Sequence, residues 1–194
     1  MKILMVTEFF PTGKDLKFSG GVEARTYFVA KFLAKTHKVS VVCTKQPKSK
    51  QFEKIDGINV YRVGPEIKYY ATGKPGDLIT VSKFIKAAIN KGSELNPDLV
   101  EGNNFLCHLI AKEISRNIKK PLVFWYPDVF IGQWIKTSGL FTGLFGWMLE
   151  KFNLLRSADF FITISKTSRD KLIKVGVNKK IQIIHCGIDE KEFK

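Results

Sequence analysis

The chain has 194 residues, of which 44% are hydrophobic and 26% charged, a composition typical of one globular domain or two small ones. Its three cysteines, an odd number with no CxxC pair, argue against a disulfide framework and favour a reducing compartment. No apolar run reaches the length of a membrane span, and the N-terminus shows no secretory cleavage pattern. The formal net charge of +14 favours an anionic partner, such as a phosphorylated ligand, a lipid surface or a nucleic acid.

The basic residues are scattered along the chain. No zinc finger or RNP-like pattern occurs, so we expect no nucleic-acid partner. The longest apolar run, over residues 141–149, stops at Glu150 and Lys151. It predicts either a core helix or a helix at a membrane interface, and we favour the core because most apolar helix faces are buried.

Two hydrophobic periodicities alternate along the chain. Short, mostly apolar runs predict strands over residues 2–7, 38–44, 57–64, 99–101, 122–126, 159–165 and 180–186. Stripes at helical spacing predict helices over residues 21–35, 77–91, 105–115 and 168–176. A basic, polar connection covers residues 45–56, and a Gly-, Pro- and Tyr-rich loop covers residues 66–76. We therefore predict an α/β, Rossmann-like three-layer domain with a mostly parallel sheet of about six or seven strands.

Two adjacent glycines, Gly20 and Gly21, separate the first predicted strand from the first helix. Their spacing fits neither GxGxxG nor GxxxxGK[ST]. One explanation is a tight turn, which we favour from the local sequence alone. The other is the close approach of an anion, because free N–H groups and the helix dipole attract negative charge there and glycine has no Cβ. Glu23, in the first helical turn, would compete with such an anion.

In parallel sheets, ligands bind beyond the carboxyl ends of the strands. Glu101 ends a predicted strand at that edge, and Asn103 or Asn104 either faces a ligand or caps the next helix. Further on, Asp128 either takes a proton from a substrate hydroxyl or caps a turn after Pro127. Both alternatives stay open for each of these residues.

Aromatic residues are dense around the same loop. Aromatic faces stack on sugar rings, although they serve equally well in a core. We favour the core for Trp125, which lies within a strand, and a ligand contact for Trp134, which lies in the loop. Ser165 is expected to cap the helix that follows it, through Asp170. The histidines are isolated in sequence, so we predict no metal site.

Six segments carry a resemblance that covers nearly the whole chain. In chain order they are MKILMVTEFFP, GGVE, HKVSVVCT, NPDLVEGNN, RSADFFITISKTSRDKLIKVGV and KIQIIHCGIDEKEF. Each is weakly specific, but the ordered set resembles the N-terminal half of GT-B glycosyltransferases of family 4, also called group 1. The resemblance implies an enzyme that moves a hexosyl group from a nucleotide-sugar to an acceptor hydroxyl with retention of configuration.

In that family the N-terminal domain holds the acceptor, and the C-terminal domain binds most of the nucleotide-sugar. The resemblance therefore makes residues 1–194 the N-terminal Rossmann-like domain, half of a GT-B architecture, with the nucleotide-sugar domain absent from this chain. The chain alone is then expected to be inactive or nearly so. The resemblance also implies a cytoplasmic protein, peripheral at the inner membrane surface where the acceptor is lipid-linked.

The resemblance and the residue types together give roles to individual residues. The donor diphosphate is assigned to Gly20 and Gly21. The acceptor, a sugar or a lipid-linked molecule, is assigned to Glu101, Asn103, Tyr126 and Trp134. Many relatives have a histidine after the strand 122–126; this chain has none there, which makes Asp128 the candidate base. No cofactor and no metal are expected beyond the nucleotide-sugar substrate. The alternative is a non-catalytic Rossmann-like module that docks on an anionic membrane surface or a partner protein.

Overall fold

The computed structural model describes residues 1–12, 18, 20–67, 75–155 and 158–187. Within these ranges, one sheet of eight strands runs through the molecule in the order β3-β4-β2-β1-β5-β6-β7-β8. All neighbouring strands are parallel except β3 and β4. The strands are β1 (Lys2–Val6), β2 (Lys38–Lys45), β3 (Phe52–Ile55), β4 (Ile58–Glu66), β5 (Leu99–Gly102), β6 (Leu122–Trp125), β7 (Phe160–Thr163) and β8 (Lys180–Ile183). The predicted α/β, Rossmann-like fold is confirmed, with slightly more strands than expected.

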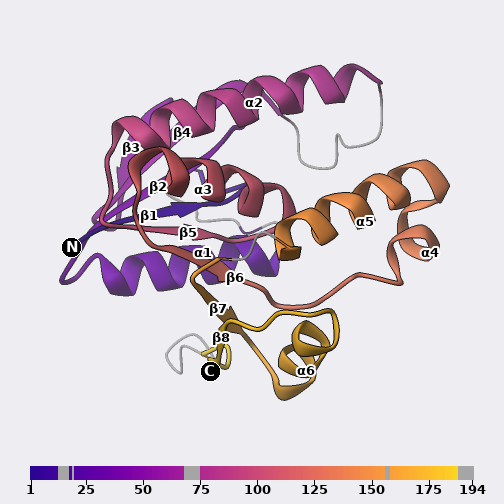
Figure 1. The fold of residues 1–194 in the computed structure, drawn as a ribbon. Helices are drawn as coiled ribbons and strands as arrows, with labels where there is room; N and C mark the ends of the chain where they lie inside the picture. Colours follow the sequence, from indigo (N-terminus) through magenta and orange to yellow (C-terminus); the bar gives the residue numbers. More distant parts are fainter. Residues whose placement is uncertain (13–17, 19, 68–74, 156–157, 188–194) are drawn as a thin grey trace, which may run out of the picture.

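Helices cover both faces of this sheet. They are α1 (Gly21–Leu33), α2 (Pro75–Glu94), α3 (Phe105–Ile118), α4 (Trp134–Ser138), α5 (Leu140–Leu155) and α6 (Lys166–Lys174). Figure 1 shows α1 on one side of the sheet and α2 and α3 on the other. Two apolar clusters match this arrangement, one under α1 around Met5 and Tyr27, the other around Leu4 and Ile110. The sheet is buried on both faces, as the nearly all-apolar strand β1 indicates.

Strand β3 was not predicted from the sequence. It pairs antiparallel with β4 through a two-residue turn at Asp56 and Gly57. Both residues have positive φ, 46° and 86°, which is the backbone that Asp-Gly favours in tight hairpins. The Asp-Gly pair was therefore the signal for a hairpin inside what we expected to be a polar connection.

The region of α4 and α5 also differs from expectation. Part of the predicted loop forms α4, and the apolar helix continues past Glu150 and Lys151 to Leu155. Gly143 and Gly146 let the two helices touch, because a Cβ at Gly146 would overlap the indole ring of Trp134 and one at Gly143 would overlap the α4 backbone. Glu150 does not end the helix because its side chain is fully buried rather than facing water.

Other expectations concern single residues and loops. Ser165 caps α6 as predicted, but through the backbone N–H of Ser168 at 3.1 Å rather than through Asp170. The predicted loop over residues 66–76 falls mostly outside the described residues, and Pro75 already begins α2. The three cysteines are free. In the described part of the chain, no helix is long and apolar enough to cross a membrane.

Candidate functional site at the carboxyl edge of the sheet

The carboxyl ends of the central strands meet at one edge of the sheet. The strand register pairs Val6 with Gly102, and Gly102 with Phe124. The residues that the sequence analysis selected follow these strand ends or open the helix after β1. The structure sorts them into a glycine-flanked helix N-terminus, a buried cluster around Arg25, a loop around Asp128 and a buried cluster around Glu150.

Gly20 and Gly21 lie at the N-terminus of α1. Gly20 is the N-cap residue with an extended backbone, φ −168° and ψ 167°, and no side chain caps this helix. Gly21 lies outside the positive-φ region, and a Cβ built there would meet nothing within 4 Å. Neither residue therefore has the backbone conformation that would require glycine. In the part of the chain that the structure describes, the backbone therefore gives no reason for glycine at these two positions, and Gly21 is exposed while Gly20 is half-buried.

Glu23, in the first turn of α1, is buried, with only 4% of the residue exposed. Burial raises the pKa of the Cys43 thiol in β2, and the charge of Glu23 adds to this rise. The competition between Glu23 and an anion that the sequence suggested stays a prediction.

Arg25, one turn further along α1, forms a buried cluster with three residues of the sheet edge. Its Nη1 donates to Oε1 of Glu101 and, at 2.7 Å, to Oδ1 of Asn103. Its guanidinium carbon lies 4.8 Å from the centre of the Trp125 ring, a cation–π contact. The side chains of Arg25 and Glu101 are 14% and 7% exposed. We call Arg25, Glu101, Asn103 and Trp125 the Arg25 cluster.

The two asparagines after β5 have different roles. Asn104 is the N-cap of α3 and accepts from the backbone N–H of Cys107 at 3.0 Å. Asn103 belongs to the Arg25 cluster, and its Nδ2 donates to the carbonyl of Val6 at 3.3 Å. Asn104 also donates to the carboxylate of Glu8 at 3.2 Å, and burial raises the pKa of that carboxyl. Glu8 thus adds a second acidic residue to this edge.

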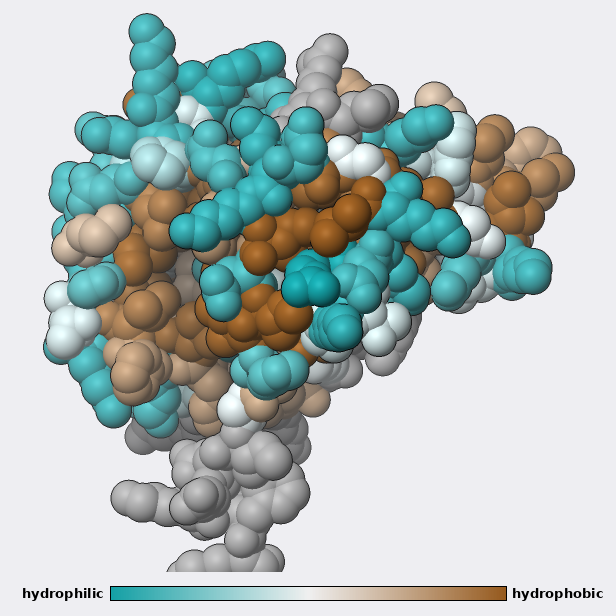
Figure 2. Space-filling model, turned by 60° about the horizontal axis from the view of Figure 1, so that its bottom comes forward, coloured by the Kyte–Doolittle hydropathy of each residue, from teal (hydrophilic) through white to brown (hydrophobic). Residues whose placement is uncertain are grey.

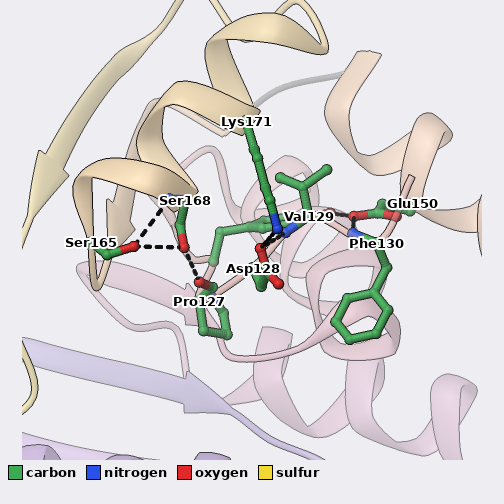
Figure 3. A network of polar contacts seen from close by, with 9 residues as sticks. Pro127, Asp128, Val129, Phe130, Glu150, Ser165, Ser168 and Lys171 are labelled. Atoms are coloured by element: carbon green, nitrogen blue, oxygen red, sulfur yellow. Dashed lines mark hydrogen bonds and ion pairs between the residues drawn. The ribbon is translucent and has the colours of Figure 1, made fainter. Parts of the chain in front are cut away.

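The loop after β6 is held by α6 (Figure 3). Asp128 Oδ1 accepts from Nζ of Lys171 at 2.8 Å and from the backbone N–H of Val129 at 2.8 Å. The hydroxyl of Ser168 donates to the carbonyl of Pro127 at 2.6 Å. The Asp128 side chain remains 41% exposed. Asp128 therefore stabilises its own loop and still reaches solvent, so that both predicted roles remain compatible with the structure.

Glu150 of α5 holds the far end of that loop. It accepts from the Tyr126 hydroxyl at 2.8 Å, from the backbone N–H of Phe130 at 2.9 Å and from Nε1 of Trp134 at 2.6 Å. Burial raises the pKa of Glu150, and the three donors only partly oppose this. We call Glu150, Tyr126, Phe130 and Trp134 the Glu150 cluster.

The Glu150 cluster changes the view of two predicted acceptor residues. Tyr126 is completely buried, so the structure does not place it where it could touch an acceptor. Trp134 is half-buried, and its ring packs 5.0 Å from the ring of Phe105. Both side chains fix the geometry of the loop that carries Asp128. Trp125, expected in the core, is 4% exposed.

Sequence reasoning missed three residues of this edge: Arg25, Lys171 and Glu150. Arg25 and Lys171 looked like ordinary basic residues on helix surfaces, and their acidic partners lie 76 and 43 positions away. Glu150 had a usable signal, since a lone acidic residue inside an apolar helix needs buried donors. Among the described residues, no three His, Cys, Asp or Glu side chains gather as a metal site would need. The absence of a metal stays a prediction.

The mostly parallel sheet with helices on both faces defines a Rossmann-like α/β domain. A family model, Glycosyltransferase Family 4, matches residues 19–192. Because this match covers most of the chain, the protein belongs to Glycosyltransferase Family 4. Among curated protein sequences, none matches the chain significantly.

Solved structures with this fold include three proteins of similar organisation. Sucrose-phosphate synthase of Thermosynechococcus elongatus aligns with 98% of this chain and 49% of its own, with a TM-score of 0.71 and 15% identity. HepE of Anabaena, solved with UDP-glucose, aligns with 98% and 45%, with a TM-score of 0.64 and 18% identity. The lipopolysaccharide outer core galactosyltransferase WaaB aligns with 97% and 46%, with a TM-score of 0.56 and 12% identity. At these identities the likeness shows the fold alone, and this chain spans about half the length of each structure.

Proposed function

We propose that this chain is the acceptor-side half of a retaining, hexosyl-type glycosyltransferase that uses a nucleotide-sugar donor. The observation that carries the proposal is the N-terminus of α1. A Cβ built at Gly21 would meet nothing within 4 Å, and the backbone conformation there does not require glycine. Free N–H groups at such a terminus bind phosphate oxygens, and the helix dipole favours their charge. Membership of Glycosyltransferase Family 4 supports a sugar diphosphate as the anion.

In the proposed reaction, an acceptor hydroxyl oxygen forms a bond to the anomeric carbon of the donor sugar on the face from which the diphosphate departs, so that the configuration is retained. The bond from that carbon to the diphosphate oxygen breaks, and the amides of Gly20 and Gly21 stabilise the charge on the departing diphosphate. Asp128 is the candidate base for the hydroxyl proton, because its carboxylate is part-exposed and oriented by Lys171. The nucleotide is held by a second domain, and no metal is required in this scheme.

The Arg25 cluster belongs to the acceptor side of the proposed site. Glu101 and Asn103 are held by Arg25 and are only 6% and 0% exposed, so they support this side of the site from below the surface and offer no free hydrogen-bonding groups. Asp128 lies on the neighbouring loop and Trp134 begins α4 after it, and the Glu150 cluster holds both. Such a rigid support positions Asp128, the part-exposed residue of this group, for an acceptor hydroxyl.

The diphosphate proposal is tested on the 194-residue chain itself by amide NMR. Titration with UDP-glucose, UDP and inorganic pyrophosphate should shift the amide signals of Gly21 and Val22 before those of other residues. Replacement of Gly21 by Ala, Val and Leu should weaken these shifts in order of side-chain size. Because nothing meets a Cβ at Gly21, the Gly21→Ala chain should be as stable as the wild type or slightly more so. A destabilised Gly21→Ala chain that still shows full ligand shifts would contradict the diphosphate proposal and favour the tight-turn explanation of the glycine pair.

Transfer itself is tested on the full-length protein that contains residues 1–194. We expect transfer from a nucleotide-sugar, a product with the anomeric configuration of the donor, and a strong loss of kcat with Asp128→Asn. Inversion in the product would remove only the stereochemical part of the proposal. The absence of transfer from any UDP- or GDP-sugar would favour the non-catalytic module instead. The 194-residue chain alone should be inactive or nearly so, and a normal rate from it would contradict the half-site.

A further inference from the structure

Helix α5 has the reverse of the usual amphipathic pattern. Among the described side chains, four of its five buried positions carry small or polar residues, Gly143, Gly146, Glu150 and Asn153, and the fifth, Leu154, packs in the core. Its solvent-facing positions form a stripe of large apolar side chains, which we call the α5 stripe: Leu140, Phe141, Leu144, Phe145, Met148 and Phe152. A helix in a globular protein normally buries its apolar stripe and exposes its polar one.

The exposure of the α5 stripe is high. Phe141 is 87% exposed, Phe145 60% and Met148 57%, and Ile135 of the adjoining α4 is 51% exposed. Figure 2 shows apolar side chains at the right-hand tip of the molecule, where Figure 1 places α4 and α5. From Phe141 to Phe152 the stripe extends about 17 Å along the helix. A contiguous exposed apolar patch of this kind is typical of a surface that binds a membrane or another protein.

The charges of α4 and α5 that face solvent are of one sign. Residues 134–155 contain three charged side chains, Lys136, Glu150 and Lys151. Glu150 is fully buried among its three donors, so only the two lysines face solvent. Nζ of Lys151 lies 4.8 Å from the centre of the Trp147 ring. An aromatic ring and a cation are therefore adjacent at the margin of the stripe. The whole chain adds a net charge of +14.

We propose that the α5 stripe inserts into the surface of an anionic lipid bilayer and holds the protein there peripherally. An apolar helix face with lysines at its margin fits the boundary between acyl chains and negatively charged headgroups. A protein partner would be expected to meet charges of both signs at the rim of its interface. Sixteen residues give α5 a length of about 24 Å, less than the hydrocarbon thickness of a bilayer, so the helix lies along the surface.

Docking in this orientation concerns the candidate site, because the opposite face of the same helix holds the loop of Asp128. Glu150 binds the backbone N–H of Phe130, two residues beyond Asp128. A bilayer at the α5 stripe therefore lies about one helix diameter from that loop, roughly 10 Å. An acceptor anchored in the membrane would reach the site by this route. This last step rests on the proposed function, whereas docking on the bilayer does not.

Vesicle co-sedimentation of the 194-residue chain tests the proposal. We expect binding to vesicles of phosphatidylcholine with one third phosphatidylglycerol at low salt, weaker binding at high salt, and little binding to phosphatidylcholine alone. The double variant Phe141→Asp/Phe145→Asp should reduce the binding about tenfold or more. The matched control is Phe32→Asp/Leu78→Asp, which changes two equally exposed apolar residues on α1 and α2 and the same net charge. Its residual binding should clearly exceed that of the α5 variant.

A second measurement does not depend on an acidic substitution. A Phe141→Cys chain, with the exposed Cys186 replaced by Ser, carries an environment-sensitive dye on the stripe. Anionic vesicles should shift the dye emission to the blue, and a dye at Phe32→Cys should shift less. Three outcomes overturn the proposal: no binding to anionic vesicles at low salt, equal loss in the α5 variant and its control, or a dimer in solution that Phe141→Asp/Phe145→Asp dissociates. The last outcome would assign the stripe to a second copy of the chain. None of these readouts requires a sugar donor, so their failure is separate from failure of the proposed function.

Discussion

Arg25 and Glu101 form an ion pair that joins the second turn of α1 to the end of β5, across 76 positions of sequence. The pair is largely buried, and Arg25 also binds Asn103 and lies over Trp125. The helix that starts at Gly21 is therefore attached to the carboxyl edge of the sheet by a charged contact close to its N-terminus. The position of the α1 amides depends on this contact.

Replacement of Glu101 by Gln should lower the free energy of unfolding by about 2 kcal/mol, because it leaves the Arg25 charge buried without its carboxylate. Urea unfolding at neutral pH measures this effect. The exposed pair of Arg169 and Asp170 provides the control, and Asp170→Asn should change the same quantity by less than about 0.5 kcal/mol. Equal effects of the two substitutions would mean that the Arg25 pair contributes no more than a surface contact.

Replacement of Glu150 by Ala should destabilise the protein by about 3 kcal/mol. The hydroxyl of Tyr126, the backbone N–H of Phe130 and the indole N–H of Trp134 would lose their acceptor inside the protein. Tyr126→Phe removes one of these donors and should cost only about 1 kcal/mol. Chemical denaturation measures both values, and Glu94→Ala, at an exposed carboxylate on α2, is the control.

If Glu150→Ala and Tyr126→Phe lowered the free energy of unfolding equally, the contacts of Glu150 with the Phe130 backbone and the Trp134 indole would contribute nothing to stability. The loop of Asp128 would then depend on α6 alone, through Ser168 and Lys171. That result would also remove the physical link between the α5 stripe and the candidate site.

The order of strands and helices was accessible from sequence because each central strand is a nearly continuous apolar run bounded by polar residues. The register of β1 with β2 and β5 buries these runs on both faces. Such a run is recognisable in the sequence without knowledge of tertiary contacts. Strand β3 was not found because its burial alternates between half-buried and exposed positions at the edge of the sheet. Only its Asp-Gly turn carried the information.

The candidate site was less accessible, because its contacts join residues far apart in sequence. Asn103 and Asn104 are identical in type and adjacent, yet one is a buried partner of Arg25 and the other caps α3. Sequence indicated both alternatives and could not divide them between the two residues. Which face of α5 packs on the protein was also not predicted. Its apolar residues predicted burial, whereas the structure exposes most of them. Only the glycines and Glu150 on the opposite face reveal which side packs.

Replacement of Gly143 by Ala should destabilise the protein although alanine favours helices. The added Cβ would overlap backbone atoms of Trp134 and Ile135, and no side-chain rearrangement can relieve such an overlap. We expect a loss of about 2 kcal/mol, after a helix-propensity gain of about 1 kcal/mol is subtracted. Thermal unfolding measures the loss. Thr142→Ala, at the neighbouring exposed position of α5, is the control and should be neutral or slightly stabilising.

Acid should destabilise the protein through His108, which is fully buried in α3. Burial lowers the pKa of His108 from 6.5 to about 4, and the ring lies between Phe124 and Tyr126 with its Nε2 3.0 Å from the carbonyl of Trp125. Between pH 6.5 and 4 the unfolded chain therefore binds a proton at this residue that the folded chain does not. The His108 contribution to stability is complete above pH 6.5 and falls by about 3 kcal/mol as the pH drops to 4.

The His108→Gln chain isolates this contribution, because a glutamine amide still donates to the Trp125 carbonyl but does not titrate. Urea unfolding from pH 7 to pH 4 should show a shallower loss of stability for this variant than for the wild type, by about 3 kcal/mol over the range. Glu8 and Glu150, whose pKa values burial raises, act in the opposite direction and cancel in the difference between the two chains. Parallel slopes for the wild type and His108→Gln would show that His108 does not titrate differently in the folded and unfolded chains.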